Sequence, residues 1–130
     1  MNNTLKKFDN VYLIVGRALL GTYFLLPGIM KIAQYGVTLS LMQAKGVPIA
    51  EALLPLTIVL QIGLGFLLII GKAVRVSALL LFGITILINL HIHNFWALGD
   101  DLSYAHELQN FIKNLGIAAG LLVLAGRGGD

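Results

Sequence analysis

Hydrophobic residues are grouped into four long runs separated by short polar stretches. The helices that these runs predict cover about residues 11–32, 49–70, 74–92 and 104–125. Roughly 20 apolar residues are enough for a helix to cross a bilayer, so each run has a membrane-spanning length. The pattern predicts an all-α fold: a single domain, residues 1–130, that forms an integral membrane, antiparallel four-helix bundle.

Two connections add detail to this arrangement. Between the first and second helices, polar and apolar residues alternate over Tyr35–Val47, which predicts a short amphipathic helix or loop lying at the membrane interface. Pro48 suits the first turn of the second helix. The second helix is expected to stop at Gly71, and Lys72–Arg75 is so short a turn that the second and third helices should be antiparallel neighbours.

Composition supports a membrane protein and narrows its chemistry. The chain is 58% hydrophobic and only 12% charged, whereas soluble domains average about 25% charged residues. It has no cysteine, which excludes disulfide exchange, thiolate metal sites and c-type haem attachment. The basic residues are scattered at helix ends, as the positive-inside rule explains, and this favours the lipid bilayer over nucleic acid as the partner.

Basic residues at the helix ends also predict the orientation. The side that holds both termini carries more of them than the opposite side, which has Lys31 and Lys45. The richer side carries Lys6, Lys7, Lys72, Arg75 and Arg127. We therefore expect both termini in the cytoplasm and the loop at residues 94–103 outside.

Polar residues within the helices are the candidates for function, because charged groups at membrane depth are costly. In the fourth helix His106, Asn110 and Lys113 follow one another at i, i+4 and i+7 and share a face. His93 and Trp96 extend a similar face from the third helix, and the two faces should meet near the outer interface. Arg17 and Gln61 complete the set, with Gln61 expected beside Lys113 at mid-membrane. The predicted ligand-binding residues are Arg17, Gln61, His93, Trp96, His106, Asn110 and Lys113.

Simpler interpretations of the same residues remain open. The polar face of the fourth helix is also typical of interhelical hydrogen bonding, which contributes roughly 0.6 kcal/mol per bond. Trp96 suits an interfacial aromatic belt. His91, His93 and His106, with Asp100 or Asp101, are weak candidates for a metal site, and we predict no metal.

Four segments, in order, carry a resemblance to a known family. They read GRALLGTYFLLPGIMK, QIGLGFLLIIGKAVRVSALLL, HIHNFW and NFIKNLGIAAGLLVLA, and span roughly residues 16–125. Together they resemble the DoxX family. The resemblance implies a small four-helix protein of the bacterial inner membrane, related to the quinone-linked DoxD subunit of a thiosulfate-oxidising enzyme. At one position the family usually has glutamate, where this chain has Gln61. If the family pairs that carboxylate with the helix-four lysine, the pair has lost its charge here.

Two functions are compatible with these observations. The first is a redox-linked subunit that binds a quinone or another lipophilic small molecule in a polar pocket between the third and fourth helices. The chain lacks a self-contained catalytic constellation, so it would be at most an accessory subunit of a partner oxidoreductase. The alternative is a non-catalytic scaffold or assembly factor that uses the G-x-x-x-G face at Gly116 and Gly120 to hold another membrane protein or a second copy of itself. A transporter is less favoured, because the sequence has neither an inverted repeat nor a clearly broken helix pair.

Overall fold

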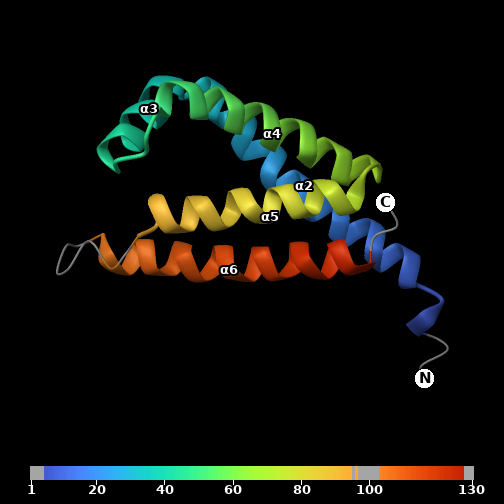
Figure 1. Cartoon of the computed structure of the whole chain (residues 1–130). Helices are drawn as coiled ribbons and strands as arrows, with labels where there is room; N and C mark the ends of the chain where they lie inside the picture. The colour runs from blue at the N-terminus through green and yellow to red at the C-terminus, as the bar shows by residue number, and fades with distance from the viewer. Residues whose placement is uncertain (1–4, 95, 97–102, 128–130) are drawn as a thin grey trace.

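The computed structural model describes residues 5–94, 96 and 103–127, and this part of the chain is helical. Its long helices lie along one another, and a short helix lies at one end of the molecule (Figure 1). They are α2 (Asp9–Ala33), α3 (Tyr35–Ala44), α4 (Ala50–Ile70), α5 (Val74–His91) and α6 (Tyr104–Arg127). The helices α2, α4, α5 and α6 each have the length and the apolar composition needed to cross a membrane. The predicted fold class, an all-α membrane bundle, is confirmed.

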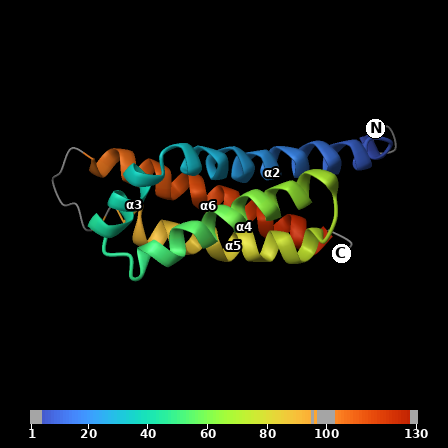
Figure 2. The ribbon, with the colours of Figure 1, turned by 90° about the horizontal axis from the view of Figure 1, so that it is seen from above.

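The long helices associate in two pairs. The most extensive contacts join α2 to α4 and α5 to α6, while α4 and α5 meet less extensively. Both termini lie at one end of the molecule and α3 lies at the other, and the two pairs diverge toward α3 (Figure 1). Seen from above, all four long helices run along a common direction (Figure 2).

Glycines bring α2 and α4 into backbone contact. A Cβ added at Gly21 would lie 2.5 Å from the carbonyl oxygen of Gly65, and one added at Gly65 would lie 2.7 Å from that of Gly21. Small residues permit such close approach between membrane helices. The close contact that we predicted for the G-x-x-x-G of α6 is not formed among the described residues. A Cβ at Gly116 would have no neighbour within 4 Å, and one at Gly120 would meet only Leu20, at 4.0 Å.

The packed core lies toward the end that holds the termini. Its buried residues come from all four long helices and are Phe24, Leu68, Val74, Ala78, Leu81, Leu121, Leu124 and Ala125. Two arginines close this end by bonding to the last turns of helices. Arg17 Nε donates to the carbonyl oxygen of Leu68 at 2.7 Å, and Arg75 Nε donates to that of Ala125 at 3.0 Å. Both satisfy carbonyl groups near a helix C-terminus, where a positive charge is favourable.

The connection between α2 and α4 is a short helix, α3, which is one of the two forms that the sequence predicted for this segment. None of its residues is buried. A turn with Gly46 in the left-handed region (φ 78°) reverses the chain toward α4. Because α3 folds back at the end where the helix pairs separate, it forms one wall of the space between them.

Candidate functional site

Two adjoining cavities occupy the space between the helix pairs. The larger, about 750 Å³, is mostly apolar and is lined by residues of α2, α3, α4 and α5, among them Met30, Met42 and Leu60. The smaller, about 260 Å³, lies among α2, α4, α5 and α6. Four residues line both cavities, namely Pro27, Lys31, Ile88 and His93. The cavities are therefore two parts of one site, which we call the slot.

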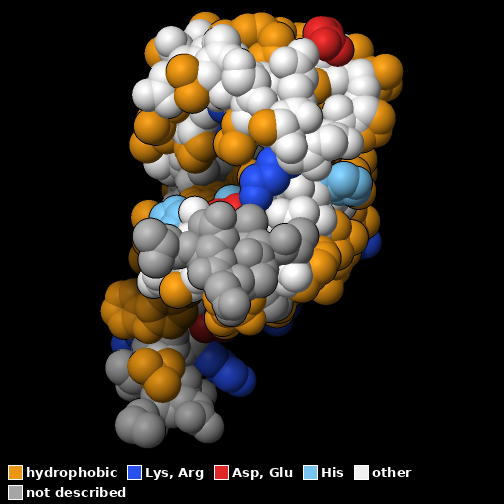
Figure 3. Space-filling view, turned by 90° about the vertical axis from the view of Figure 1, so that its left-hand side faces the viewer, with side chains coloured by type: hydrophobic (Ala, Val, Ile, Leu, Met, Phe, Trp, Pro, Cys, Tyr) orange, Lys and Arg blue, Asp and Glu red, His pale blue; other side chains and the backbone are white. Residues whose placement is uncertain are grey.

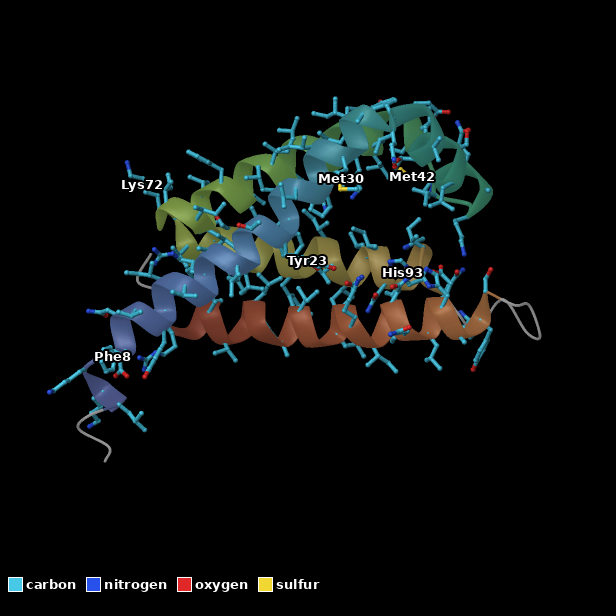
Figure 4. All side chains as sticks on the ribbon, turned by 180° about the vertical axis from the view of Figure 1, so that it is seen from behind. Phe8, Tyr23, Met30, Met42, Lys72 and His93 are labelled. Atoms are coloured by element: carbon cyan, nitrogen blue, oxygen red, sulfur yellow. The ribbon has the colours of Figure 1, made fainter. Side chains whose placement is uncertain are left out.

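The figures show the slot at the α3 end. Figure 3 looks onto this end, where basic, acidic and histidine side chains gather beside a hollow in a largely uncharged surface. In Figure 4, Met30 and Met42 lie on one side of the space between the helix pairs and His93 lies on the other. Tyr23 lies farther from α3, and Phe8 and Lys72 mark the opposite end. The slot thus extends from the α3 end, where the larger cavity lies, toward the middle of the bundle, where Tyr23 and Gln61 line the smaller one.

The smaller cavity brings polar side chains together from four helices. Tyr23 of α2 donates its hydroxyl to Oδ1 of Asn114 on α6, at 2.9 Å. Lys113 Nζ lies 5.8 Å from the centroid of the Tyr23 ring, a distance at which a cation is attracted to the ring face. The Thr85 hydroxyl donates to the carbonyl oxygen of Leu81 in its own helix, at 2.8 Å. These contacts fix the orientation of the side chains that line the cavity.

Gln61 is one of the buried polar residues that line the smaller cavity. It is only 4% exposed, and its Oε1 has no hydrogen-bond partner among the described residues. A buried acceptor without a donor is uncommon and destabilising, by about 1–3 kcal/mol. Gln61 therefore lines the slot with a side chain whose amide oxygen is buried and unsatisfied.

A cluster of charged and polar groups, centred on Glu107, closes the α3 end. Glu107 Oε1 lies 3.3 Å from His93 Nδ1 and 3.3 Å from Asn110 Nδ2, and Oε2 lies 3.5 Å from Lys45 Nζ. Lys45 Nζ also donates to Asn94 Oδ1 at 3.3 Å. Lys45 lies at the C-terminal end of α3, and Glu107 belongs to α6. The cluster therefore connects α3 to the pair formed by α5 and α6.

His93 is the titratable group of the slot that lies beyond the membrane-spanning helices. Burial lowers the pKa of its imidazole below the usual 6.5, and this outweighs the Glu107 contacts, which raise it. The charges of Lys113 and Lys45 act in the same direction as burial. His93 is therefore neutral at pH 7. Because a carboxylate only accepts hydrogen bonds, Nδ1 carries the proton and Nε2 is left as an acceptor.

The structure brings together three of the seven predicted ligand-binding residues: Gln61, His93 and Lys113 line the smaller cavity. The expected pairing of Gln61 with Lys113 is replaced by the stacking of Lys113 on Tyr23. Lys113 is also exposed rather than buried. The cavity lies among four helices, whereas the pocket that we predicted lay between the third and fourth alone.

The other four predicted residues lie outside the slot. Asn110 supports it indirectly, since its Nδ2 contacts Glu107 and also His106 Nε2 at 3.2 Å. His106 is exposed. Trp96 is 53% exposed and meets the ring of Phe111 edge-on at 5.6 Å. Arg17 lies at the opposite end of the bundle, on the last turn of α4.

Sequence reasoning missed several contributors, although periodicity offered a signal for them. Glu107 precedes Asn110 by three residues and Asn114 by seven, which places it on the polar face of α6. Tyr23 and Lys31 are separated by eight residues, or two helical turns plus about a residue, and share one face of α2. Amphipathic analysis of both helices would have included these residues.

The weak metal candidates do not converge in the described part of the chain. No group of three His, Asp or Glu side chains within metal-binding reach is found among those residues. His91 Nδ1 contacts the carbonyl oxygen of Leu87 in its own helix at 3.1 Å, whereas His93 contacts Glu107. Asp100 and Asp101 lie outside the described residues.

Comparison with known proteins establishes the relationship that the sequence segments suggested. The profile of the DoxX family matches residues 12–94. The chain is similar to "Inner membrane protein YqjF" of Escherichia coli (strain K12), with 36% identity over 121 residues, which is 93% of this chain and 87% of that protein. No solved structure matches. With four apolar helices of membrane-spanning length, the chain belongs to the DoxX family and is a multi-pass inner membrane protein.

Proposed function

We propose that this protein binds a lipophilic small molecule, a quinone in the first instance, and acts as an accessory subunit of an oxidoreductase. The main observation in support of this proposal is the slot, in which a polar cavity of about 260 Å³ adjoins an apolar cavity of about 750 Å³. Ligand sites usually have volumes of about 300–1,000 Å³, with mostly apolar walls and a few polar groups that fix orientation. A head group in the polar cavity and a hydrocarbon tail in the apolar one match this division.

The polar cavity offers groups that recognise a ring bearing oxygen atoms. Lys113 supplies a cationic donor, and Lys31 lies where the two cavities join. The amide of Gln61 and the imidazole of His93 add hydrogen-bonding capacity on the other walls. None of the residues that line this cavity is acidic, so an oxygen-rich head group meets attraction rather than repulsion.

The apolar cavity extends to the surface that the bilayer covers. Leu56 and Leu87 both line it and are 51% and 59% exposed. A ligand dissolved in the membrane therefore has a lateral route into the slot without crossing water. The chain has no cysteine to provide a dithiol couple, so a bound quinone would exchange electrons with a partner oxidoreductase. The cavities favour this function over the scaffold alternative, which rests on the unpartnered G-x-x-x-G face of α6.

The proposal is tested by ligand binding to the full-length protein in lipid nanodiscs, with decylubiquinone as the probe. We expect saturable binding and a higher melting temperature, because a ligand at 100 times its Kd stabilises the folded state by about 2.7 kcal/mol. Lys113→Met should weaken binding by about tenfold, the effect of one lost charge-assisted contact. Lys72→Met, in the turn at the other end of the bundle, is the matched control. Absence of saturable binding to the wild-type protein would refute the proposal.

A further inference from the structure

Two lysines line the polar cavity without an acidic partner. Lys31 of α2 lies where the two cavities join, and Lys113 of α6 lies over the Tyr23 ring. Neither lysine forms an ion pair in the part of the chain that the structure describes. Among the same residues, the walls of both cavities contain no aspartate or glutamate. The slot is therefore lined by positive charge alone.

The carboxylate at the α3 end does not balance this charge. Glu107 Oε1 accepts from His93 Nδ1 and Asn110 Nδ2, each at 3.3 Å, and Oε2 lies 3.5 Å from Lys45 Nζ. Lys45 thus supplies the positive charge that Glu107 neutralises. Because His93 is neutral at pH 7, it contributes no charge of its own.

The polar cavity reaches the middle of the bundle, where an unpaired cation is unfavourable. Tyr23 and Gln61, which line this cavity, lie near the middle of α2 and α4. Figure 4 shows Tyr23 between Phe8, at one end of the molecule, and His93, on the α3 side. Charged side chains within membrane-spanning segments usually pair with a counter-charge. A ligand that carries a negative charge would supply one here.

Charge attraction distinguishes such a ligand from a neutral one. A lysine can donate a hydrogen bond to a neutral carbonyl as well as to an anion, so hydrogen bonding alone gives little selectivity. The attraction between opposite charges is stronger and extends well beyond hydrogen-bond distance, particularly where the dielectric constant is low. Lys31 and Lys113 therefore both stabilise an anion within this small cavity, even where only one of them contacts it.

We infer that the slot selects a ligand with an anionic head group, and that Lys31 and Lys113 together determine this preference. The inference rests on the proposed function: for a quinone, such a head group is a ring with an ionised hydroxyl beside a carbonyl. The negative charge of this hydroxyquinone spreads over the ring oxygens. A spread charge is less costly to remove from water than the compact charge of a phosphate, and a phospholipid keeps its phosphate at the membrane interface.

The experiment compares two quinones that differ in this charge. One is a decyl-substituted hydroxynaphthoquinone, ionised at mildly alkaline pH, and the other is its methyl ether, which stays neutral. Their Kd values are measured by isothermal titration calorimetry with the full-length protein in phosphatidylcholine nanodiscs. The preference is the Kd of the ether divided by the Kd of the hydroxyquinone. Because partition into the lipid affects this ratio equally for every variant, differences between variants report the slot.

We expect the ratio to be at least about tenfold higher for the wild-type protein than for the double variant Lys31→Met/Lys113→Met, the effect of losing a charge-assisted contact. Binding of the ether to the double variant shows that its slot remains folded. If the double variant binds neither compound, the single variants Lys31→Met and Lys113→Met decide, and each should lower the ratio.

Two control variants separate charge from other effects. Lys31→Arg/Lys113→Arg retains both positive charges and should keep most of the preference. Lys72→Met removes a cation from the turn between α4 and α5, at the other end of the bundle, and should leave the ratio unchanged.

The possible outcomes separate the inference from the proposed function. Equal ratios in the wild-type protein and the methionine variants would overturn the inference, while the binding of both quinones would leave the proposed function intact. Nanodiscs that also contain phosphatidylglycerol test the other source of negative charge. If this lipid lowers the ratio in the wild-type protein alone, the slot takes an anionic phospholipid and the assignment to a hydroxyquinone is wrong. If neither quinone binds to the wild-type protein, the proposed function fails as well.

Discussion

Replacing Glu107 by glutamine tests whether the cluster at the α3 end holds the two halves of the bundle together. The Glu107 side chain is 12% exposed and its partner Lys45 is 19% exposed. Fully exposed ion pairs contribute about 0.2–1 kcal/mol, whereas breaking a buried pair destabilises by about 3–5 kcal/mol. The separation of 3.5 Å between Lys45 Nζ and Glu107 Oε2 is long. We therefore expect a loss between these two ranges, about 1–2 kcal/mol.

Glu107→Gln retains an oxygen that accepts from His93 Nδ1, so the measured change reports mainly the lost charge. The free energy of unfolding is measured by titration from mild detergent into a denaturing detergent, with Lys45→Met and the double variant completing a cycle. Contacting charged residues should show a coupling energy of about 1 kcal/mol. Glu51→Gln is the control, because Glu51 is exposed and bonds to Gln43 at 2.8 Å.

The reasoning would be refuted if the two substitutions acted independently on the free energy of unfolding. If Glu107→Gln destabilises no more than Glu51→Gln, or if its effect simply adds to that of Lys45→Met, the cluster does not join α3 to α6. A loss much larger than about 3 kcal/mol would instead indicate that Lys45 has no access to water once its partner is neutral.

Three further predictions concern stability. Folding depresses the pKa of His93, so the unfolded state binds more protons, and the free energy of unfolding should fall as the pH drops below about 6.5. The difference between the free energies of unfolding at pH 7.5 and pH 5.5 should be smaller for His93→Gln than for the wild-type protein. Gly65→Ala should destabilise by about 1–3 kcal/mol in the same assay, because its Cβ meets the α2 backbone, whereas Gly63→Ala, with open space around it, should not. Arg17→Met should destabilise by about 1–2 kcal/mol through loss of the bond to Leu68, yet leave the Kd for decylubiquinone unchanged; weaker binding would contradict its position outside the slot.

The fold was predictable because bilayer thickness and backbone hydrogen bonding leave few solutions for this pattern. Four runs of spanning length must be helices, since an unsatisfied backbone group is unfavourable in lipid. The predicted bounds differ from the observed ones by at most two residues, most at Asp9, where α2 starts, and at Arg127, where α6 ends. These helix ends are polar, and hydropathy alone does not mark them.

The site was harder to predict because it depends on which helices pair. Arg17 and Gln61 look alike in the sequence as polar residues within apolar runs, yet Arg17 caps α4 at one end while Gln61 lines the slot. Glu107 gains its function from Lys45, which is 62 residues away. Contacts of that range follow from the tertiary arrangement, and periodicity within one helix does not reveal them.

Photoaffinity labelling tests the central claim, that a lipophilic ligand occupies the slot, most directly. The full-length protein in nanodiscs is irradiated with an azido derivative of decylubiquinone, and the labelled residues are identified by mass spectrometry. We predict insertion at residues that line the cavities, such as Met42 and Ile88, with labelling suppressed by excess unmodified decylubiquinone. Labelling confined to the lipid-facing residues Val59 and Val76, which are 66% and 59% exposed, and insensitive to competition would contradict the account.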